Sequence, residues 1–203
     1  MIGFVQAGGA STRFGSDKAL VRLDGKTMLA RTTEIVAAVC DSVQIVAPAG
    51  KYPNPPAVVW ADRYPGEGPL GGILTALSAI SSSFAGDPWA LIVGCDMPFL
   101  TGDFLSHLRR RAENSTAQVV VPQSANGLEP LCAAWHVHAL SQVQATFDAG
   151  IRKVTEVIQR LPAEVLDQSD WRGFDIEGRL FWNMNTQEDF EQARQILQGK
   201  RQP

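Results

Sequence analysis

Residues 6–18 contain the residue types that a phosphate-binding loop needs. This segment, QAGGASTRFGSDK, follows an apolar stretch at residues 2–6 and combines small residues with two cations, Arg13 and Lys18. Glycine lets backbone N–H groups approach phosphate oxygens, and Arg and Lys can neutralise the charge that moves during phosphoryl transfer. The pattern predicts a nucleoside triphosphate site, whereas the alternative is a flexible connection with two solvated cations. The nucleotide contacts expected at its start are Gln6, Ala7, Gly8 and Gly9.

This loop does not match the common nucleotide motifs. A P-loop needs a lysine directly after its second glycine, whereas Gly15 is followed by Ser16-Asp17-Lys18. The loop also lacks the Gly-x-Gly-x-x-Gly spacing of dinucleotide-binding folds, and the chain has no Gly-x-Ser-x-Gly nucleophile elbow. These departures argue against a P-loop NTPase, a dehydrogenase built on this loop and a hydrolase of the elbow type.

Two aspartates come directly after predicted strands. Asp96 follows the apolar residues 89–94, and Asp62 follows residues 57–60. Ligands bind beyond the carboxyl ends of strands in an open parallel sheet, and the Asp96 carboxylate there suits Mg²⁺, which also takes substrate phosphates. For both residues a turn or capping role is the alternative.

Asn183 and Asn185 precede the last predicted helix. Residues i and i+2 of an extended segment face the same side, so both amides could reach a phosphate or a cation. An Asx turn that caps the helix is the alternative.

Apolar strands alternate with amphipathic segments along the first 110 residues, and the pattern continues less regularly afterwards. Continuous apolar strands between helices are typical of a mostly parallel sheet that is covered on both faces. No linker or internal repeat divides residues 1–203, so we expect one three-layer α/β domain. The predicted strands are residues 2–6, 43–47, 57–60, 89–94, 119–121 and 131–135, and the predicted helices are 27–39, 70–80, 101–108, 140–147, 155–161 and 186–197.

Composition excludes several classes of protein. The 203 residues are 45% hydrophobic and 19% charged, which is not the composition of a disordered chain. A net charge of −3 lacks the basic excess typical of a large nucleic-acid surface, and the most apolar stretch, residues 89–95, is too short to cross a membrane. The three cysteines show no metal or disulfide spacing. We therefore expect a cytoplasmic protein without nucleic-acid or membrane partners.

The loop and several later segments resemble the molybdenum cofactor guanylyltransferases, which are nucleotidyltransferases with a glycosyltransferase-A-like fold. Residues 8–18 carry the pattern Gly-Gly-x-Ser-x-Arg-x-Gly-x-Asp-Lys after the first strand. The resemblance runs nearly end to end. The later segments fall in the family's order: residues 23–29 (LDGKTML), 68–72 (GPLGG), 95–98 (CDMP), 129–131 (EPL) and 183–186 (NMNT).

The resemblance implies Mg²⁺-dependent transfer of GMP from GTP to molybdenum-bound molybdopterin, with release of pyrophosphate. It implies catalytic roles for Arg13 and Lys18 on the triphosphate and for Asp96 on the metal and the nucleotide, while Asn185 would complete the metal site. Further nucleotide contacts are implied for Asp62, Gly68, Pro69 and Leu70. Acceptor contacts are implied for Arg152, Lys153, Asn183 and Glu129, although a solvated helix start is the alternative for the first two.

Three other functions stay open: CMP transfer to the same pterin, nucleotide transfer to a sugar or polyol phosphate, and a non-catalytic nucleotide-binding module. The two glycine-containing loops resemble the guanine-selective members, which favours GTP. Gln6 stands where the family commonly has Leu, and Ala47 stands where some members have a nucleotide-contacting Asn. These departures leave base selectivity open. Besides the substrates, receiving apo-molybdoenzymes or other cofactor-biosynthesis proteins are the expected partners.

Overall fold

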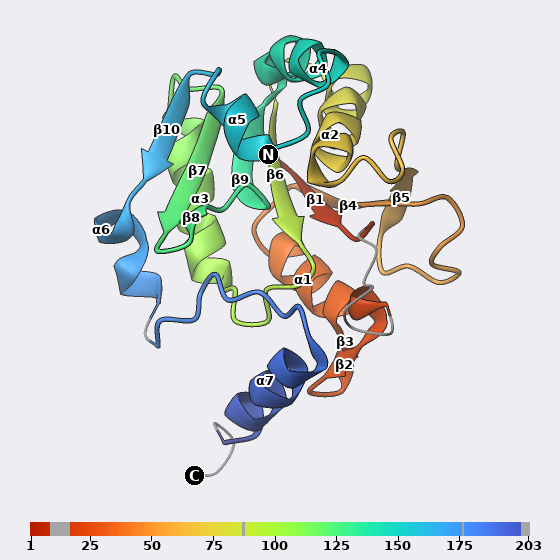
Figure 1. The fold of residues 1–203 in the computed structure, drawn as a ribbon, viewed down its shortest axis with the longest axis vertical. Helices are drawn as coiled ribbons and strands as arrows, with labels where there is room; N and C mark the ends of the chain where they lie inside the picture. The colour runs from red at the N-terminus through yellow and green to blue at the C-terminus, as the bar shows by residue number, and fades with distance from the viewer. Residues whose placement is uncertain (9–16, 87, 176, 200–203) are drawn as a thin grey trace.

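A central sheet organises the chain, as the ribbon of this computed structural model shows (Figure 1). The structure describes residues 1–8, 17–86, 88–175 and 177–199. Within them the strand order is β10-β7-β9-β6-β1-β4-β5, with β8 paired to β7, and β2 and β3 form a separate two-stranded ribbon. The strands are β1 (Ile2–Gln6), β2 (Arg22–Leu23), β3 (Lys26–Thr27), β4 (Ser42–Ala47), β5 (Val58–Ala61), β6 (Trp89–Gly94), β7 (Val119–Ser124), β8 (Gly127–Leu128), β9 (Cys132–His136) and β10 (Ala163–Leu166).

Parallel pairing brings the ends of four strands to the same edge of the sheet. β1 pairs in parallel with both β4 and β6, and β4 pairs in parallel with β5. In the register of β1 and β6, Gln6 lies beside Gly94. The segments that follow β1 and β6 therefore start side by side, which is where a ligand is expected in an open parallel sheet.

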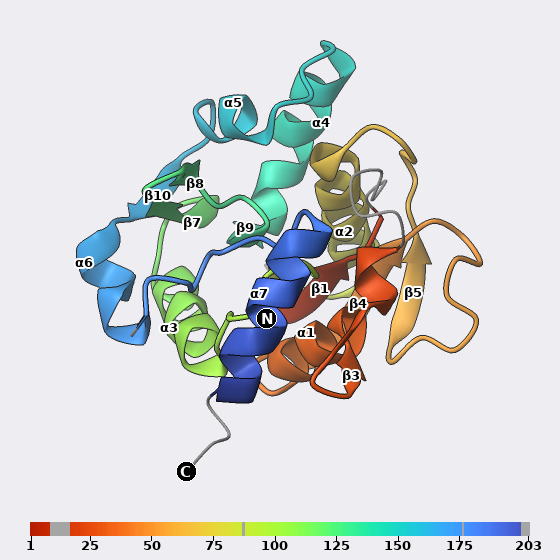
Figure 2. The ribbon, with the colours of Figure 1, turned by 60° about the horizontal axis from the view of Figure 1, so that its bottom comes forward.

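Helices cover both faces of the sheet, which confirms the predicted three-layer α/β class. One apolar cluster packs α1 and α3 on one face, and a second packs α2, α4 and α5 on the other. Figure 2 shows these layers on opposite sides of the strands. The helices are α1 (Met28–Ala37), α2 (Pro69–Ser83), α3 (Gly102–Glu113), α4 (Leu140–Asp148), α5 (Val154–Ile158), α6 (Gln168–Trp171) and α7 (Gln187–Gly199), and the 3₁₀ turns are η1 (Lys18–Leu20), η2 (Val137–Ala139) and η3 (Arg172–Phe174).

Local capping explains where several helices begin. The Thr101 hydroxyl accepts a hydrogen bond from Phe104 N at 3.3 Å, as the sequence predicts for the start of α3. The Thr186 hydroxyl accepts one from Asp189 N at 3.1 Å at the start of α7. Among the described helices, none is both long and apolar enough to cross a membrane.

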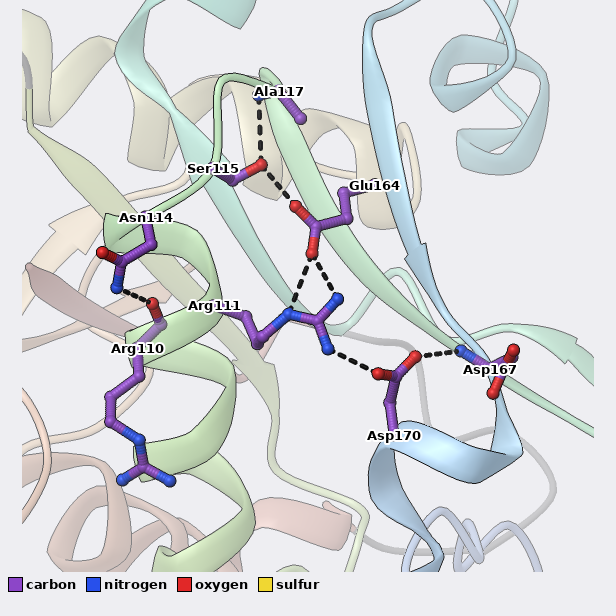
Figure 3. A network of polar contacts seen from close by, with 8 residues as sticks. All are labelled: Arg110, Arg111, Asn114, Ser115, Ala117, Glu164, Asp167 and Asp170. Carbon is purple, nitrogen blue, oxygen red and sulfur yellow. Dashed lines mark hydrogen bonds and ion pairs between the residues drawn. The ribbon is translucent and has the colours of Figure 1, made fainter.

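The second half of the sheet differs most from what periodicity predicts. β9 runs antiparallel to both β6 and β7, and β10 and α6 occupy residues for which no element was predicted. Side chains of Arg111, Glu164, Asp170 and Ser115 join α3 to β10 and α6 (Figure 3). This polar network holds the outer edge of the sheet without using the site residues.

Candidate functional site

A cavity of about 380 Å³ opens at the carboxyl ends of β1 and β6. Its walls come from the segments that follow these strands and from the connection between β5 and α2. The lining residues are Gln6, Ala7, Gly8, Asp17, Lys18, Ala19, Asp62, Gly66, Gly68, Pro69, Gly94, Cys95, Asp96 and Leu131. Segments far apart in sequence thus meet at the edge of the sheet where a ligand was expected.

Lys18 lies where two oxygen-bearing side chains converge. Its ammonium nitrogen is 3.3 Å from Asp96 Oδ2 and 3.0 Å from Asn185 Oδ1. The Lys18 and Asp96 side chains are 18% and 25% exposed, so solvent reaches this ion pair only in part. A cation and two oxygen ligands in a half-buried cavity could hold the phosphates of a nucleotide and a divalent metal ion.

Asn185 reaches Lys18 because the segment before α7 is tied to the end of β6. Met184 is buried, and its backbone N–H donates to Asp96 O at 2.8 Å. The Asp189 carboxylate accepts from the backbone N–H of Asn185 and of Thr186, both at 2.7 Å. The local turn and the approach to Lys18 therefore coexist, so the two sequence-based interpretations of Asn185 do not exclude each other.

Asp62 combines a turn with a place in the cavity wall. Its Oδ1 accepts from Tyr64 N at 3.0 Å and from the Thr75 hydroxyl at 3.3 Å. Its other oxygen faces Gly8, where a Cβ atom would lie 3.7 Å from Asp62 Oδ2. Gly68 precedes α2 with φ of 75°, a conformation that glycine adopts without strain, and Pro69 then begins the helix.

Gln6 joins the end of β1 to the start of α2. Its side-chain Nε2 donates to Pro69 O at 3.1 Å. Its Oε1 is buried and has no hydrogen-bond partner among the described residues. The amide lies directly against Gly72, where a Cβ atom would be 2.0 Å from Nε2. Gln6 therefore lines the cavity while its Oε1 stays buried without a hydrogen-bond partner among the described residues.

Burial shifts the pKa of two further groups in this region. Burial, together with the charges of Asp96 and Asp17, raises the pKa of the Cys95 thiol to about 12. Cys95 is therefore a thiol rather than a nucleophilic thiolate. Burial also raises the pKa of Glu129 above its usual value, Asp96 adds to this, and a 2.6 Å hydrogen bond from Ser124 opposes it.

Comparison with known proteins identifies the family. The sequence profile of the MobA-like NTP transferase domain matches residues 3–165. The chain belongs to the MobA-like NTP transferase family. A relative named molybdenum cofactor guanylyltransferase, from Desulfosudis oleivorans, is 33% identical over 201 residues, covering 98% of this chain and 96% of the relative. One of the same name from Syntrophotalea carbinolica is 28% identical over 191 residues, covering 94% and 89%.

A solved structure of similar fold extends this likeness to three dimensions. The molybdopterin-guanine dinucleotide biosynthesis protein A of Archaeoglobus fulgidus superimposes with a TM-score of 0.79 at 25% sequence identity. The match covers 98% of this chain and 100% of the archaeal one. The predicted nucleotidyltransferase fold and the predicted family are therefore confirmed.

In this MobA-like chain most of the predicted nucleotide contacts share the cavity. Leu70 is fully buried and is not among the residues that line the cavity, and Gly9 and Arg13 lie outside the described residues. Those that line the cavity are Gln6, Ala7, Gly8, Lys18, Asp62, Gly68, Pro69 and Asp96.

The predicted acceptor contacts lie outside the cavity lining. The Arg152 guanidinium pairs with Glu67, donates to Phe147 O at 2.6 Å and lies 3.8 Å from the centre of the Phe147 ring. Lys153 has a side chain that is 71% exposed. The Asn183 amide donates to Phe181 O at 3.3 Å, beside the Met184 segment that reaches Asp96. Arg152 is thus linked to the loop that forms one cavity wall rather than to the cavity itself.

Sequence reasoning missed some residues that line the cavity or contact its lining. Asp17 lines the cavity and is one residue before Lys18, so its place in the motif was a usable signal. Leu131 also lines the cavity. It follows Glu129-Pro130, a segment in which only Glu129 was predicted as a site residue. Lys51 and Tyr52, which contact Asp17, lie in a proline-rich connection with no motif that could have revealed them.

Proposed function

We propose that this protein transfers GMP from GTP to molybdenum-bound molybdopterin and releases pyrophosphate. In this reaction an oxygen of the acceptor's terminal phosphate forms a bond to the α-phosphorus of GTP. The bond from that phosphorus to the oxygen bridging to the β-phosphate breaks, and the electron pair leaves with pyrophosphate. No protein nucleophile is needed, since positioning and charge stabilisation carry such transfers, and this agrees with the neutral Cys95 thiol.

One observation carries the proposal. The Lys18 ammonium lies 3.3 Å from Asp96 Oδ2 and 3.0 Å from Asn185 Oδ1, at the edge of the sheet where a phosphate is expected. The name shared by the relatives supports GTP and molybdopterin as the substrates. Under this proposal Lys18 places its charge on the triphosphate, and Arg13 acts there with it. The ammonium of Lys18 then stabilises negative charge that develops on the leaving pyrophosphate.

The oxygen atoms of this site fit a divalent cation such as Mg²⁺. Asp96 Oδ2 and Asn185 Oδ1 both lie within hydrogen-bond distance of one cationic atom, the ammonium of Lys18, so they already face a common point. Among the described residues, no three His, Cys, Asp or Glu side chains gather as a metal site. Two protein oxygens suit a metal ion that takes its other ligands from phosphates and water. When bound, Mg²⁺ would neutralise phosphate charge and polarise the α-phosphate.

The rest of the cavity would hold the nucleoside. Asp62 and Gly8 face each other across its wall, and Gly68 and Pro69 present backbone groups to it. Gln6 lines the same cavity, and its Oε1, which is buried without a partner among the described residues, would have to turn toward the nucleotide to accept from a base N–H. An unpaired buried acceptor penalises a base that cannot supply a donor, and this is how such sites discriminate.

The acceptor contacts belong to the same proposal. Asn183 lies in the segment tied to Asp96, and the charge of Asp96 acts on Glu129. Arg152 would have to exchange its contact with Glu67 for the acceptor phosphate, while Lys153 already presents an exposed ammonium. The free thiols of the three cysteines suit a reducing cytoplasm, and receiving apo-molybdoenzymes are the proposed further partners.

Pyrophosphate release tests the proposal. Purified protein with Mg²⁺ and molybdopterin is given GTP, CTP or ATP in parallel, and the pterin product is analysed by mass. Release with GTP alone, together with a guanine dinucleotide product, is expected. Release with CTP alone would overturn the base assignment, and silence with all three would overturn the transfer of a nucleotide to this pterin. Omitting Mg²⁺ tests the metal in the same assay.

A further inference from the structure

The proline-rich connection between β4 and β5 brings two polar side chains to the glycine loop. The Tyr52 hydroxyl lies 2.8 Å from Ala7 O and 3.2 Å from Asp17 Oδ2. The Lys51 ammonium lies 3.4 Å from the same carbonyl oxygen and 3.1 Å from the same carboxylate oxygen. Ala7 and Asp17 stand before and after residues 8–16 in the sequence. Each of the two side chains therefore contacts both ends of the glycine loop.

The environment of these contacts makes them stronger than surface pairs. Tyr52 is 7% exposed, and the side chains of Lys51 and Asp17 are 25% and 23% exposed. Burial, followed by the charge of Asp17, raises the pKa of Tyr52, so its hydroxyl keeps the proton that it donates. The ammonium has three N–H donors and can serve the carbonyl and the carboxylate together. Partly desolvated, charge-assisted hydrogen bonds of this kind are the stronger ones.

Asp17 passes this contact on to Lys18. While its Oδ2 faces Lys51 and Tyr52, its Oδ1 accepts from Ala19 N at 3.1 Å and so caps the short η1 turn. Lys18 is the first residue of that turn, and its ammonium reaches Asp96 and Asn185. A continuous path of contacts thus runs from the β4–β5 connection through Asp17 to the ammonium of Lys18 in the cavity.

We infer that Lys51 and Tyr52 are positioning residues of the nucleotide site: they form a clasp that joins Ala7 O to the Asp17 carboxylate. The clasp holds the two ends of the glycine loop together and orients η1 so that Lys18 points into the cavity. Lys51 and Tyr52 do not line the cavity themselves. Because a preorganised site loses less free energy on binding, the clasp increases the affinity for a nucleoside triphosphate. The consequence for GTP rests on the proposed function.

The variants Tyr52→Phe, Lys51→Met and their combination test the clasp. Tyr52→Phe removes one oxygen and keeps the ring, and Lys51→Met keeps most of the side-chain length. Lys51→Arg is the conservative variant, since it retains a charged donor. Ser115→Ala is the matched control, because its hydroxyl donates to Glu164 in the network of Figure 3, away from the cavity.

Two measurements separate positioning from a merely structural role. Calorimetry with Mg²⁺ gives the Kd for GTP, and hydrogen exchange of the ligand-free protein follows the Ala19 amide that donates to Asp17. We expect the double variant to raise Kd about tenfold and to speed exchange at Ala19. Lys51→Arg is expected to stay within about threefold of the wild-type Kd. Ser115→Ala should lower thermal stability while both readouts stay at wild-type values.

Each outcome decides between the clasp and the proposed function. A wild-type Kd in the double variant overturns the clasp as a positioning device, even if Ala19 exchanges faster. A raised Kd in Ser115→Ala of the same size overturns it too, since general destabilisation would then explain the effect. A wild-type protein that binds GTP but releases no pyrophosphate with molybdopterin overturns the proposed function alone.

Discussion

Replacing Gly72 by Ala tests whether the Gln6 amide fills the space between β1 and α2. A Cβ atom at position 72 would lie 2.0 Å from Gln6 Nε2 and 2.4 Å from Gln6 Cδ. Real atoms do not approach this closely, so the Gln6 side chain would have to move. Gly72 is buried, and the displaced amide would leave its hydrogen bond to Pro69 O.

Opposing contributions set the size of the effect. Alanine is more favourable than glycine in a helix by about 1 kcal/mol, so an empty neighbourhood would make Gly72→Ala stabilising. Loss of the hydrogen bond from Gln6 to Pro69 costs about 1 kcal/mol, and forcing the half-buried Gln6 side chain out of its place against Gly72 costs about 1–3 kcal/mol. The collision therefore wins, and we expect the free energy of unfolding to fall by about 1–3 kcal/mol.

Urea unfolding of four proteins measures the interaction directly. They are the wild type, Gly72→Ala, Gln6→Ala and the double variant. In the Gln6→Ala background the colliding atoms are gone, so the same change at position 72 is expected to be neutral or to stabilise by up to about 1 kcal/mol. Gly71→Ala is the control, because its Cβ would meet the backbone oxygen of Tyr64 at 2.9 Å, which Gln6→Ala does not clear.

An equal loss from Gly72→Ala in both backgrounds would refute the reasoning, since the collision with Gln6 would then not be its cause. A gain in the wild-type background would refute it as well, because the amide would have moved at no cost. The Kd for GTP gives a second readout. Gln6 lines the cavity, so Gly72→Ala is expected to weaken GTP binding as it displaces this side chain.

Three further predictions concern charged groups. Asp96→Ala removes the carboxylate beside Lys18 and is expected to lower kcat for pyrophosphate release at least ~100-fold. The circular dichroism spectrum should stay native, and full activity would exclude Asp96 from metal binding. Arg111→Met breaks the ion pairs with Glu164 and Asp170, and since these groups are partly exposed we expect a stability loss of about 1 kcal/mol in urea unfolding, with turnover unchanged. Burial raises the pKa of Glu129, so ionised Glu129 lowers stability above that pKa. Glu129→Gln is therefore expected to raise the free energy of unfolding at pH 7. This gain should shrink as the pH falls through the raised pKa of Glu129 and vanish below the pKa that Glu129 has in the unfolded chain. A gain independent of pH would contradict the assignment.

Much of the fold was predictable because its signals are local. The apolar runs that became β1, β4 and β6 alternate with helical spacing, and this pattern is decided by which side chains must leave water. Thr101 and Thr186 begin helices through hydrogen bonds to residues three positions away. Asp96 was predictable as well, since a carboxylate at the end of a buried strand lies at the edge where ligands bind.

The sequence by itself determined the layered α/β class and the family, because both are recorded in local patterns and short motifs that recur in order along the chain. Only the tertiary structure decided that β9 runs antiparallel between β6 and β7, that Asn185 meets Lys18 across 167 positions, and that Lys51 and Tyr52 hold Asp17. Such contacts depend on how distant segments pack against one another, and their gain must exceed the entropy lost in closing long loops. No local pattern of residue types records that balance.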